Sequence, residues 1–183
     1  VIKISKKLLG KVLVTNINNN LTSGIIVETE AYTGVKDRAS HAYHNKKTQR
    51  TRPMYMGGGI CYIYLCYGMY YLLNIVTNLK DIPHAILIRA LKPLDGLDII
   101  CKRRKTKTIN YNLTNGPGKL SIALGINNKL NTKSLQSKNI WIQDNGIKIA
   151  KKDILSSPRI GVDYAGADAK LPYRFYIKNN NWV

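Results

Sequence analysis

Acidic residues are scarce in this sequence. Ten aspartates and glutamates stand against 29 lysines and arginines in 183 residues, which gives a formal net charge of +19. That excess argues against an ordinary metabolic enzyme and favours a polyanionic partner. Nucleic acid is the first expectation, an anionic membrane surface the second and an acidic protein the third. A genome rich in A and T would account for part of the lysine, since asparagine and isoleucine are also abundant.

Cysteine is sparse as well. The three cysteines, Cys61, Cys66 and Cys101, are an odd number and include no C-x-x-C pair. The three histidines lie at no spacing typical of zinc ligands beside them. The first residues are basic but lack the apolar stretch and cleavage site of a secretory signal. We therefore expect reduced thiols, no metal site and a cytoplasmic protein.

Charge is absent from residues 53–79, and this is the one stretch that resembles a membrane span. Its tyrosines and its glycines at 57–59 and 68 are unsuited to a spanning helix. Aromatic residues at this density are typical of strands. We expect no membrane association.

The hydrophobic pattern predicts one α+β domain over residues 1–183, because the composition is uniform and no repeat is present. Helices are predicted at 2–10, 94–105 and 118–124. Strands are predicted at 12–15, 25–32, 60–66, 70–77, 85–91, 140–142, 147–150 and 174–178. Short connections favour a mostly antiparallel sheet. The basic segment 34–53 is long for a loop, and ordered loops of that length are commonly functional.

Two of the few acids, Glu28 and Glu30, lie inside an apolar strand. Residues two apart in a strand share a face, so both point the same way as Tyr32. A carboxylate in a partly dry pocket, beside a second one, can act as a general base on water. The alternative is that both face solvent and pair with the abundant lysines.

Tyrosines are concentrated in residues 62–71, which hold five of them. For Tyr62, Tyr70 and Tyr71 we expect half-buried packing on strands. Tyr67 differs, because it lies beside Gly68 at a predicted hairpin tip, where its own domain has little to bury it. Proteins that kink DNA insert such side chains between stacked bases.

Two glycine-rich segments are candidate phosphate sites. Residues 57–59 precede a strand and so lack the geometry of a helix N-terminus. Residues 116–119 open a predicted helix but do not match the spacing of a P-loop. The second segment can still donate backbone N–H groups to one DNA phosphate.

Five sequence blocks, in order, resemble the alkyladenine (3-methylpurine) DNA glycosylase family. They are ETEAY at 28–32 with His41, YIYLCYGMY at 62–70 with Asn74, LIRALKPLDG at 87–96, NGPGKL at 115–120, and YRFY at 173–176 through Trp182. Together they span nearly the whole chain. Their number and order make the resemblance specific, although each block alone is weak.

The resemblance implies a fold and an activity. The fold is a curved, mostly antiparallel sheet with flanking helices and a protruding DNA-intercalating β-hairpin. The activity is that of a monofunctional DNA glycosylase in base excision repair. Such an enzyme flips alkylated and deaminated purines out of double-stranded DNA and hydrolyses the N-glycosylic bond, leaving an abasic site. It implies a monomer without a cofactor, of the bacterial cytoplasmic type and working at the nucleoid.

The resemblance also implies residue roles. Glu30 is the general base, Arg89 helps to hold the water or the carboxylate, and Glu28 is structural. The flipped base lies among Tyr32, His41, Tyr64, Asn74 and Leu87. Asn74 discourages normal guanine by clashing with its exocyclic amino group. Tyr67 fills the gap in the DNA, and the other expected DNA contacts are Met69, Arg50, Arg52 and Lys119.

The chemistry is consistent with these roles. A purine glycosylic bond breaks through a cationic, oxocarbenium-like sugar, which a carboxylate stabilises. An N-alkylated purine leaves without a general acid, whereas a neutral lesion such as hypoxanthine needs one, and no residue stands out for it. Two alternatives stay open: a non-catalytic DNA- or RNA-binding module, and a bifunctional glycosylase with lyase activity through a lysine.

Overall fold

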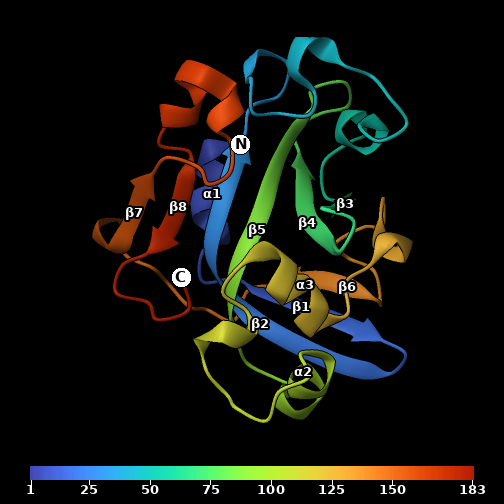
Figure 1. Ribbon diagram of the computed structural model, residues 1–183, viewed down its shortest axis with the longest axis vertical. Coiled ribbons are helices and arrows are strands. Elements are labelled where there is room, and N and C mark those ends of the chain that lie inside the picture. The colour runs from blue at the N-terminus through green and yellow to red at the C-terminus, as the bar shows by residue number, and fades with distance from the viewer.

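The longest strand determines how the sheet is built. β2 (Asn20–Tyr32) has 13 residues, enough for two successive neighbours on one edge. β1 (Val12–Ile17) pairs with its first half, and β8 (Arg174–Ile177) pairs with it farther along, at residues 28–30. β5 (His84–Pro93) pairs along the other edge. The two ends of the chain therefore meet on β2, where Figure 1 shows red β8 beside the blue strand.

The other strands extend the sheet from this centre. They are β3 (Cys61–Cys66), β4 (Tyr70–Thr77), β6 (Ile140–Gln143) and β7 (Ile154–Ser157). The order is β3-β4-β5-β2-β1-β6, with β7 joined to β8, and all neighbours are antiparallel. This computed structural model describes all residues from 1 to 183. The expected α+β class with a mostly antiparallel sheet is confirmed.

Short helices flank the curled sheet (Figure 1). The α-helices are α1 (Ile2–Leu8), α2 (Leu97–Arg103) and α3 (Pro117–Leu124). The 3-10 helices are Gly34–Lys36, Tyr43–Asn45, Arg52–Tyr55, Tyr111–Leu113, Asn128–Leu130, Lys151–Asp153 and Asp163–Lys170. Three of these lie in or at the end of the basic segment 34–53, which is therefore wound into turns. None of the helices combines the length and the hydropathy that a bilayer crossing requires.

One row of side chains crosses four strands. Tyr62 on β3 lies opposite Asn74 on β4, Asn74 lies opposite Leu87 on β5, and Leu87 lies opposite Glu30 on β2. Directly opposed residues of antiparallel strands point to the same face. Around Tyr62 this face carries a small apolar cluster, separate from the main core of 21 buried residues. The sheet itself thus aligns the predicted site residues.

Two bulges interrupt the pairing of β2 with β5. The register shifts leave Val27 on β2 and Arg89 on β5 without partners. A bulge increases the local twist and re-aims the side chains beside it. The bulged Arg89 contacts Glu28 and Glu30 on the neighbouring strand.

Two predicted elements differ from the structure in the C-terminal third. Residues 147–150 are not a strand: Ile147 and Ile149 pack against Gly10, and no backbone ladder forms. Their alternation with lysine reflects a half-buried extended segment rather than a sheet. β7 was not predicted, because its two serines obscure the apolar pattern.

The second helix is shorter than predicted, beginning at residue 97 instead of 94 and ending at 103 instead of 105. Residues 94 and 95, which were expected in its first turn, are hydrogen-bonded to β2 instead. The Leu94 amide donates to the Ser23 carbonyl, and the Asp95 amide donates to the Ser23 hydroxyl. Gly96, with φ of 71°, then turns the chain into the helix.

Candidate active site

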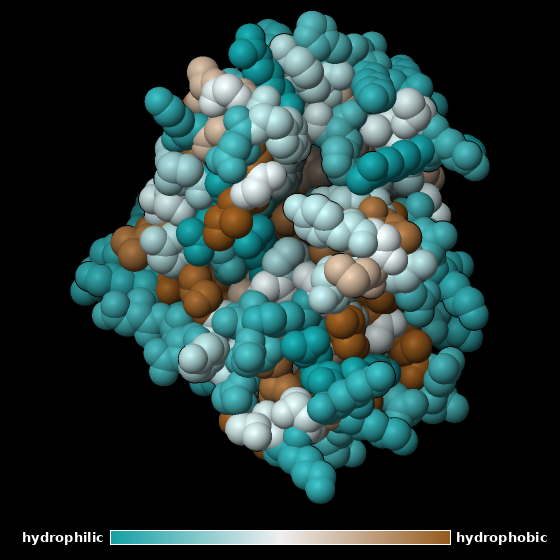
Figure 2. Space-filling view, in the orientation of Figure 1, coloured by the Kyte–Doolittle hydropathy of each residue, from teal (hydrophilic) through white to brown (hydrophobic).

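A pocket of about 240 Å³ opens on the face that carries the cross-strand row. Figure 2 shows a hollow on this side of the molecule, above the β3–β4 hairpin. The lining is mostly apolar and aromatic. It includes most of the residues predicted to hold substrate or to act on it: Tyr32, His41, Tyr64, Asn74, Leu87 and Arg89.

Glu30 lies directly behind the pocket wall and is fully buried. Its Oε1 accepts a hydrogen bond from the Ile160 amide at 2.8 Å and lies 3.3 Å from Arg89 Nη1. Its Oε2 accepts a hydrogen bond from the Tyr32 hydroxyl at 2.9 Å. All three partners line the pocket, so the carboxylate is one side chain away from its interior.

Burial raises the pKa of Glu30 above its ordinary value of 4.5, because desolvation disfavours the charged carboxylate. The Arg89 charge, the Ile160 amide and the Tyr32 hydroxyl act in the opposite direction. A carboxylate with a raised pKa binds a proton more strongly than an exposed one. That is the property a general base requires.

Glu28 is buried as well, with 3% exposed surface. Its Oε1 accepts hydrogen bonds from Arg89 Nε at 3.0 Å and from Arg174 Nε at 2.5 Å. The alternative that the two glutamates face solvent is therefore wrong. Arg89 contacts both carboxylates and holds them on one face of the sheet.

Aromatic rings form much of the pocket. The rings of His41 and Tyr64 touch edge to face, with centroids 4.7 Å apart, and Tyr32 lines the same pocket. His41 Nδ1 is 2.8 Å from the Tyr62 hydroxyl. Burial, followed by the charges of Arg50 and Lys46, lowers the pKa of His41 to about 4. The imidazole is therefore neutral at physiological pH.

Asn74 and Leu87 are buried neighbours in the cross-strand row. The Asn74 side-chain amide donates to the carbonyls of Tyr62 and Leu72 at 3.3 and 3.4 Å. These bonds fix the amide at the base of the hairpin. Both side chains thus have set positions in the pocket lining.

The β3–β4 hairpin ends in a strained tip. Tyr67 has φ of 51° and Gly68 has φ of 67°, and the Met69 amide donates to the Cys66 carbonyl. Positive φ is unusual for a bulky residue. Tyr67 is 85% exposed and Met69 67% exposed, and Tyr67 also borders the pocket. The two predicted strands do pair as an antiparallel hairpin, and its tip presents two large side chains to solvent, while insertion of this tip into DNA stays a prediction.

The three basic residues expected at DNA have different surroundings. The Arg50 guanidinium lies 4.8 Å from the centre of the Tyr64 ring, at the pocket itself. Arg52 is exposed on the 3-10 helix Arg52–Tyr55. Lys119, on α3, donates to the side-chain carbonyls of Asn112 and Asn115.

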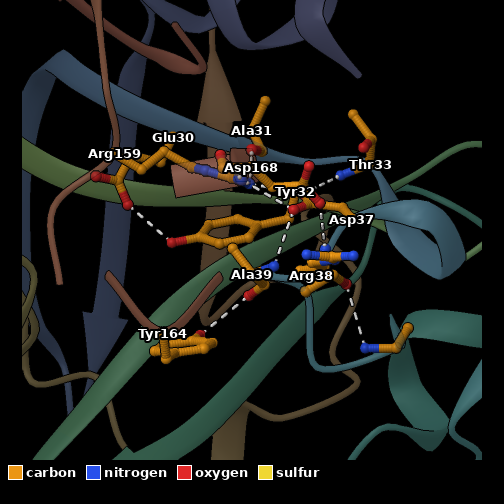
Figure 3. A network of polar contacts seen from close by, with 12 residues as sticks. Glu30, Ala31, Tyr32, Thr33, Asp37, Arg38, Ala39, Arg159, Tyr164 and Asp168 are labelled. Atoms are coloured by element: carbon orange, nitrogen blue, oxygen red, sulfur yellow. Dashed lines mark hydrogen bonds and ion pairs between the residues drawn. The ribbon is translucent and has the colours of Figure 1, made fainter. Parts of the chain in front are cut away.

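A buried arginine that the sequence did not single out organises the pocket wall (Figure 3). Arg159 Nη1 donates to Asp37 Oδ2 at 2.6 Å and to the Ala31 carbonyl at 3.0 Å. Its Nη2 donates to Asp37 Oδ1 at 2.8 Å and to the Asp168 carbonyl at 3.1 Å. Its guanidinium lies 4.8 Å from the centre of the Tyr32 ring. The one available signal was an isolated acid, Asp37, in a chain poor in acids.

Comparison with known proteins identifies the family. The family model for "Methylpurine-DNA glycosylase (MPG)" matches residues 1–181. A Chlamydia abortus protein named as a 3-methyladenine DNA glycosylase is 50% identical over 98% of this chain and 94% of its own length. Proteins of the same name from Clostridium novyi and Clostridium perfringens are each 44% identical over 100% of this chain, and over 92% and 93% of their own lengths. The chain therefore belongs to the methylpurine-DNA glycosylase family, DNA-repair hydrolases that act on N-glycosyl bonds.

Proposed function

We propose that this protein is a monofunctional glycosylase that extrudes an alkylated purine from duplex DNA and hydrolyses its N-glycosyl bond. Residues 1–183 act as a single domain and as a monomer, without a cofactor, in the bacterial cytoplasm. The observation that carries the proposal is the placement of one buried carboxylate, Glu30, behind an aromatic pocket whose rim bears the exposed Tyr67.

Extrusion is the first step. Flipping a base costs a few kcal/mol, and least where damage already weakens pairing. The Tyr67 ring fills the space that the base leaves, and Met69 packs beside it against the neighbouring pair. Both side chains are held outward by the left-handed turn, so no rearrangement of the fold is needed to present them.

Recognition of the base takes place in the pocket. The flipped purine lies among the rings of Tyr32, His41 and Tyr64, beside Leu87. A positively charged N-alkylated purine gains cation–π attraction of about 0.5–2 kcal/mol for each ring it faces. His41 suits this cation because its low pKa keeps the imidazole uncharged. The Asn74 amide, fixed in the hairpin, occupies the space where guanine would place its amino group.

Hydrolysis uses Glu30. A carboxylate offers about four acceptor positions. Tyr32, Ile160 and Arg89 take three of these in Glu30, which leaves one on Oε2 for a water molecule. Glu30 removes a proton from that water while the water oxygen forms a bond to the anomeric carbon of the sugar. The glycosyl bond breaks, and its electron pair leaves with the purine nitrogen, which neutralises the cationic base.

Neutral damaged purines should be released more slowly than alkylated, cationic ones. Deaminated purines such as hypoxanthine carry no charge, so their departure needs a proton donor. The imidazole of His41, which lines the pocket, is neutral at physiological pH and so carries no extra proton to donate. We therefore propose that deaminated purines are substrates, but slower ones than alkylated purines.

Duplex DNA carrying one modified purine per molecule tests the proposal. We expect free 3-methyladenine and 7-methylguanine together with abasic sites, slower release of hypoxanthine, and no strand cleavage. Borohydride should trap no covalent adduct, because water rather than a lysine is the nucleophile. An adduct would establish the bifunctional alternative, and binding without release of any base would establish the non-catalytic one.

A further inference from the structure

A second cavity, of about 630 Å³, lies between α1 and the segment that follows β6. Four apolar residues and six lysines line it: Leu9, Ile147, Ile149, Ile154, Lys3, Lys6, Lys7, Lys11, Lys148 and Lys151. We name it the lysine groove. It has more than twice the volume of the pocket at Glu30.

The lysine groove lies on the reverse face of the sheet from Glu30. The Ser5 hydroxyl of α1 bonds to the Thr29 hydroxyl at 2.9 Å, and Lys6 Nζ lies 4.9 Å from the Phe175 ring centre. Thr29 and Phe175 are opposite each other in β2 and β8. Successive strand residues point to opposite faces, so Glu30 points away from α1. Figure 1 shows α1 behind β2.

The charge of the groove is largely unpaired. Among the six lysines only Lys11 has an acidic partner, Asp144, at 2.6 Å. Like charges brought together repel one another and destabilise the folded state. A duplex bound over the pocket at Glu30 does not reach this face, so the proposed glycosylase activity does not use the cluster.

The floor of the groove indicates the kind of partner. Phosphates satisfy lysines but offer nothing apolar to cover isoleucine and leucine side chains. A peptide with both acidic and apolar side chains satisfies both, since its carboxylates reach the lysine rim while its apolar groups pack on the floor. We propose that the lysine groove docks an acidic segment with apolar side chains from a partner protein.

Fluorescence anisotropy with two labelled peptides tests the proposal. One alternates pairs of aspartates and leucines, and the other has serine at every leucine position. We expect the first to bind more tightly than the second. Lys6→Glu combined with Lys148→Glu should weaken binding by about tenfold or more, because opposed charges become like charges across the contact. Ile149→Ser should weaken only the leucine peptide.

Matched controls make the result decisive. Lys129→Glu combined with Lys133→Glu changes the net charge equally at exposed lysines outside the groove, and should leave peptide binding unchanged. Base release from alkylated duplex should be the same in the groove variants and the native protein, which separates this inference from the proposed activity. Circular dichroism verifies that each variant is folded.

Three outcomes would overturn the docking proposal. The first is equal loss of peptide binding in the groove and control pairs, and the second is equal binding of the two peptides. The third is a groove-dependent interaction that is stronger with phosphatidylglycerol vesicles or with a DNA duplex than with the leucine peptide. That result would assign the groove to a lipid surface or to nucleic acid instead.

Discussion

Arg159 and Asp37 form a two-point ion pair in which both side chains are fully buried. The pair joins the segment after β7 to the turn after β2, two parts of the chain separated by 122 residues. The residue next to Arg159, Ile160, donates its amide to Glu30. The ion pair therefore positions a hydrogen bond on the proposed catalytic base without touching substrate.

Replacing Arg159 should alter the pH profile as well as the rate. Lysine keeps the charge but not the planar fork, so Arg159→Lys loosens Ile160. The amide lowers the pKa of Glu30, and its loss raises that pKa further. We expect the acidic limb of kcat/KM to move to higher pH. Arg38→Lys, an exposed arginine near the same segment, is the control and should leave the limb in place. An unmoved limb in both variants would reduce Arg159 to a structural role.

Glu30→Gln should abolish base release while retaining binding of lesion-containing DNA, since shape is kept and only the base function is lost. Single-turnover kinetics and a binding titration on the same duplex measure the two effects. Glu28→Gln is the matched comparison: it weakens the contacts to Arg89 and Arg174, so we expect a lower melting temperature with residual turnover. Appreciable turnover by Glu30→Gln would remove Glu30 from the catalytic role.

The same substitution should change how stability depends on pH. The pKa of Glu30 is raised by folding, so its contribution to stability is fully present below about 4.5, the ordinary value, and is lost as pH rises through the folded value. Glutamine carries no such loss. The melting temperature of Glu30→Gln should therefore rise relative to that of the native protein as pH increases above 4.5. A constant difference between pH 4 and pH 8 would contradict the raised pKa.

Tyr67→Ala should impair extrusion and leave the chemistry of an extruded base intact. Base–aromatic stacking is worth roughly 1–3 kcal/mol, so we expect a loss of about five- to a hundredfold on well-paired lesions in duplex DNA. The loss should shrink on single-stranded DNA, where little stacking must be broken. Tyr111→Ala, another exposed tyrosine, is the control. An equal loss on both substrates would place Tyr67 in the pocket instead of the DNA stack.

Salt should weaken DNA binding, with a log–log slope of about −0.9 for each phosphate that the protein neutralises. Arg50→Gln, Arg52→Gln and Lys119→Gln should each reduce the slope by about one if the side chain contacts a phosphate. Lys6→Gln in the lysine groove should not change it. A flat response between low and physiological salt would mean that the net charge of +19 is not used on DNA.

Local patterns predicted the part of the site that lies on one strand. Alternation along β2 placed Glu28, Glu30 and Tyr32 on one face, and the Tyr32–Glu30 hydrogen bond and the shared Arg89 contacts agree with that. Such a period-two pattern needs no knowledge of distant residues. The hairpin around Tyr67 was equally local.

Contacts between distant segments were not predictable in this way. No short pattern marks Arg159 as the partner of Asp37, and Ile160 acts through a backbone amide that any residue would supply. At residues 147–150 the reverse happened: a strand was predicted where none forms. Alternating isoleucine and lysine are expected in a strand, but equally in an extended segment that is half-buried beside α1. In both cases the local structure depends on contacts with residues far away in the sequence.

The capping of Glu30 also has a consequence for synthesis of the protein. The ribosome makes the chain from its N-terminus, and the amide that caps this carboxylate lies 130 residues downstream of it. Arg174, the second partner of Glu28, follows later still. A nascent chain or a prematurely terminated one therefore carries the aromatic pocket residues without the completed acid centre. If Glu30 is the base that we propose, we expect such fragments to release no damaged purine, so that base removal is restricted to finished molecules.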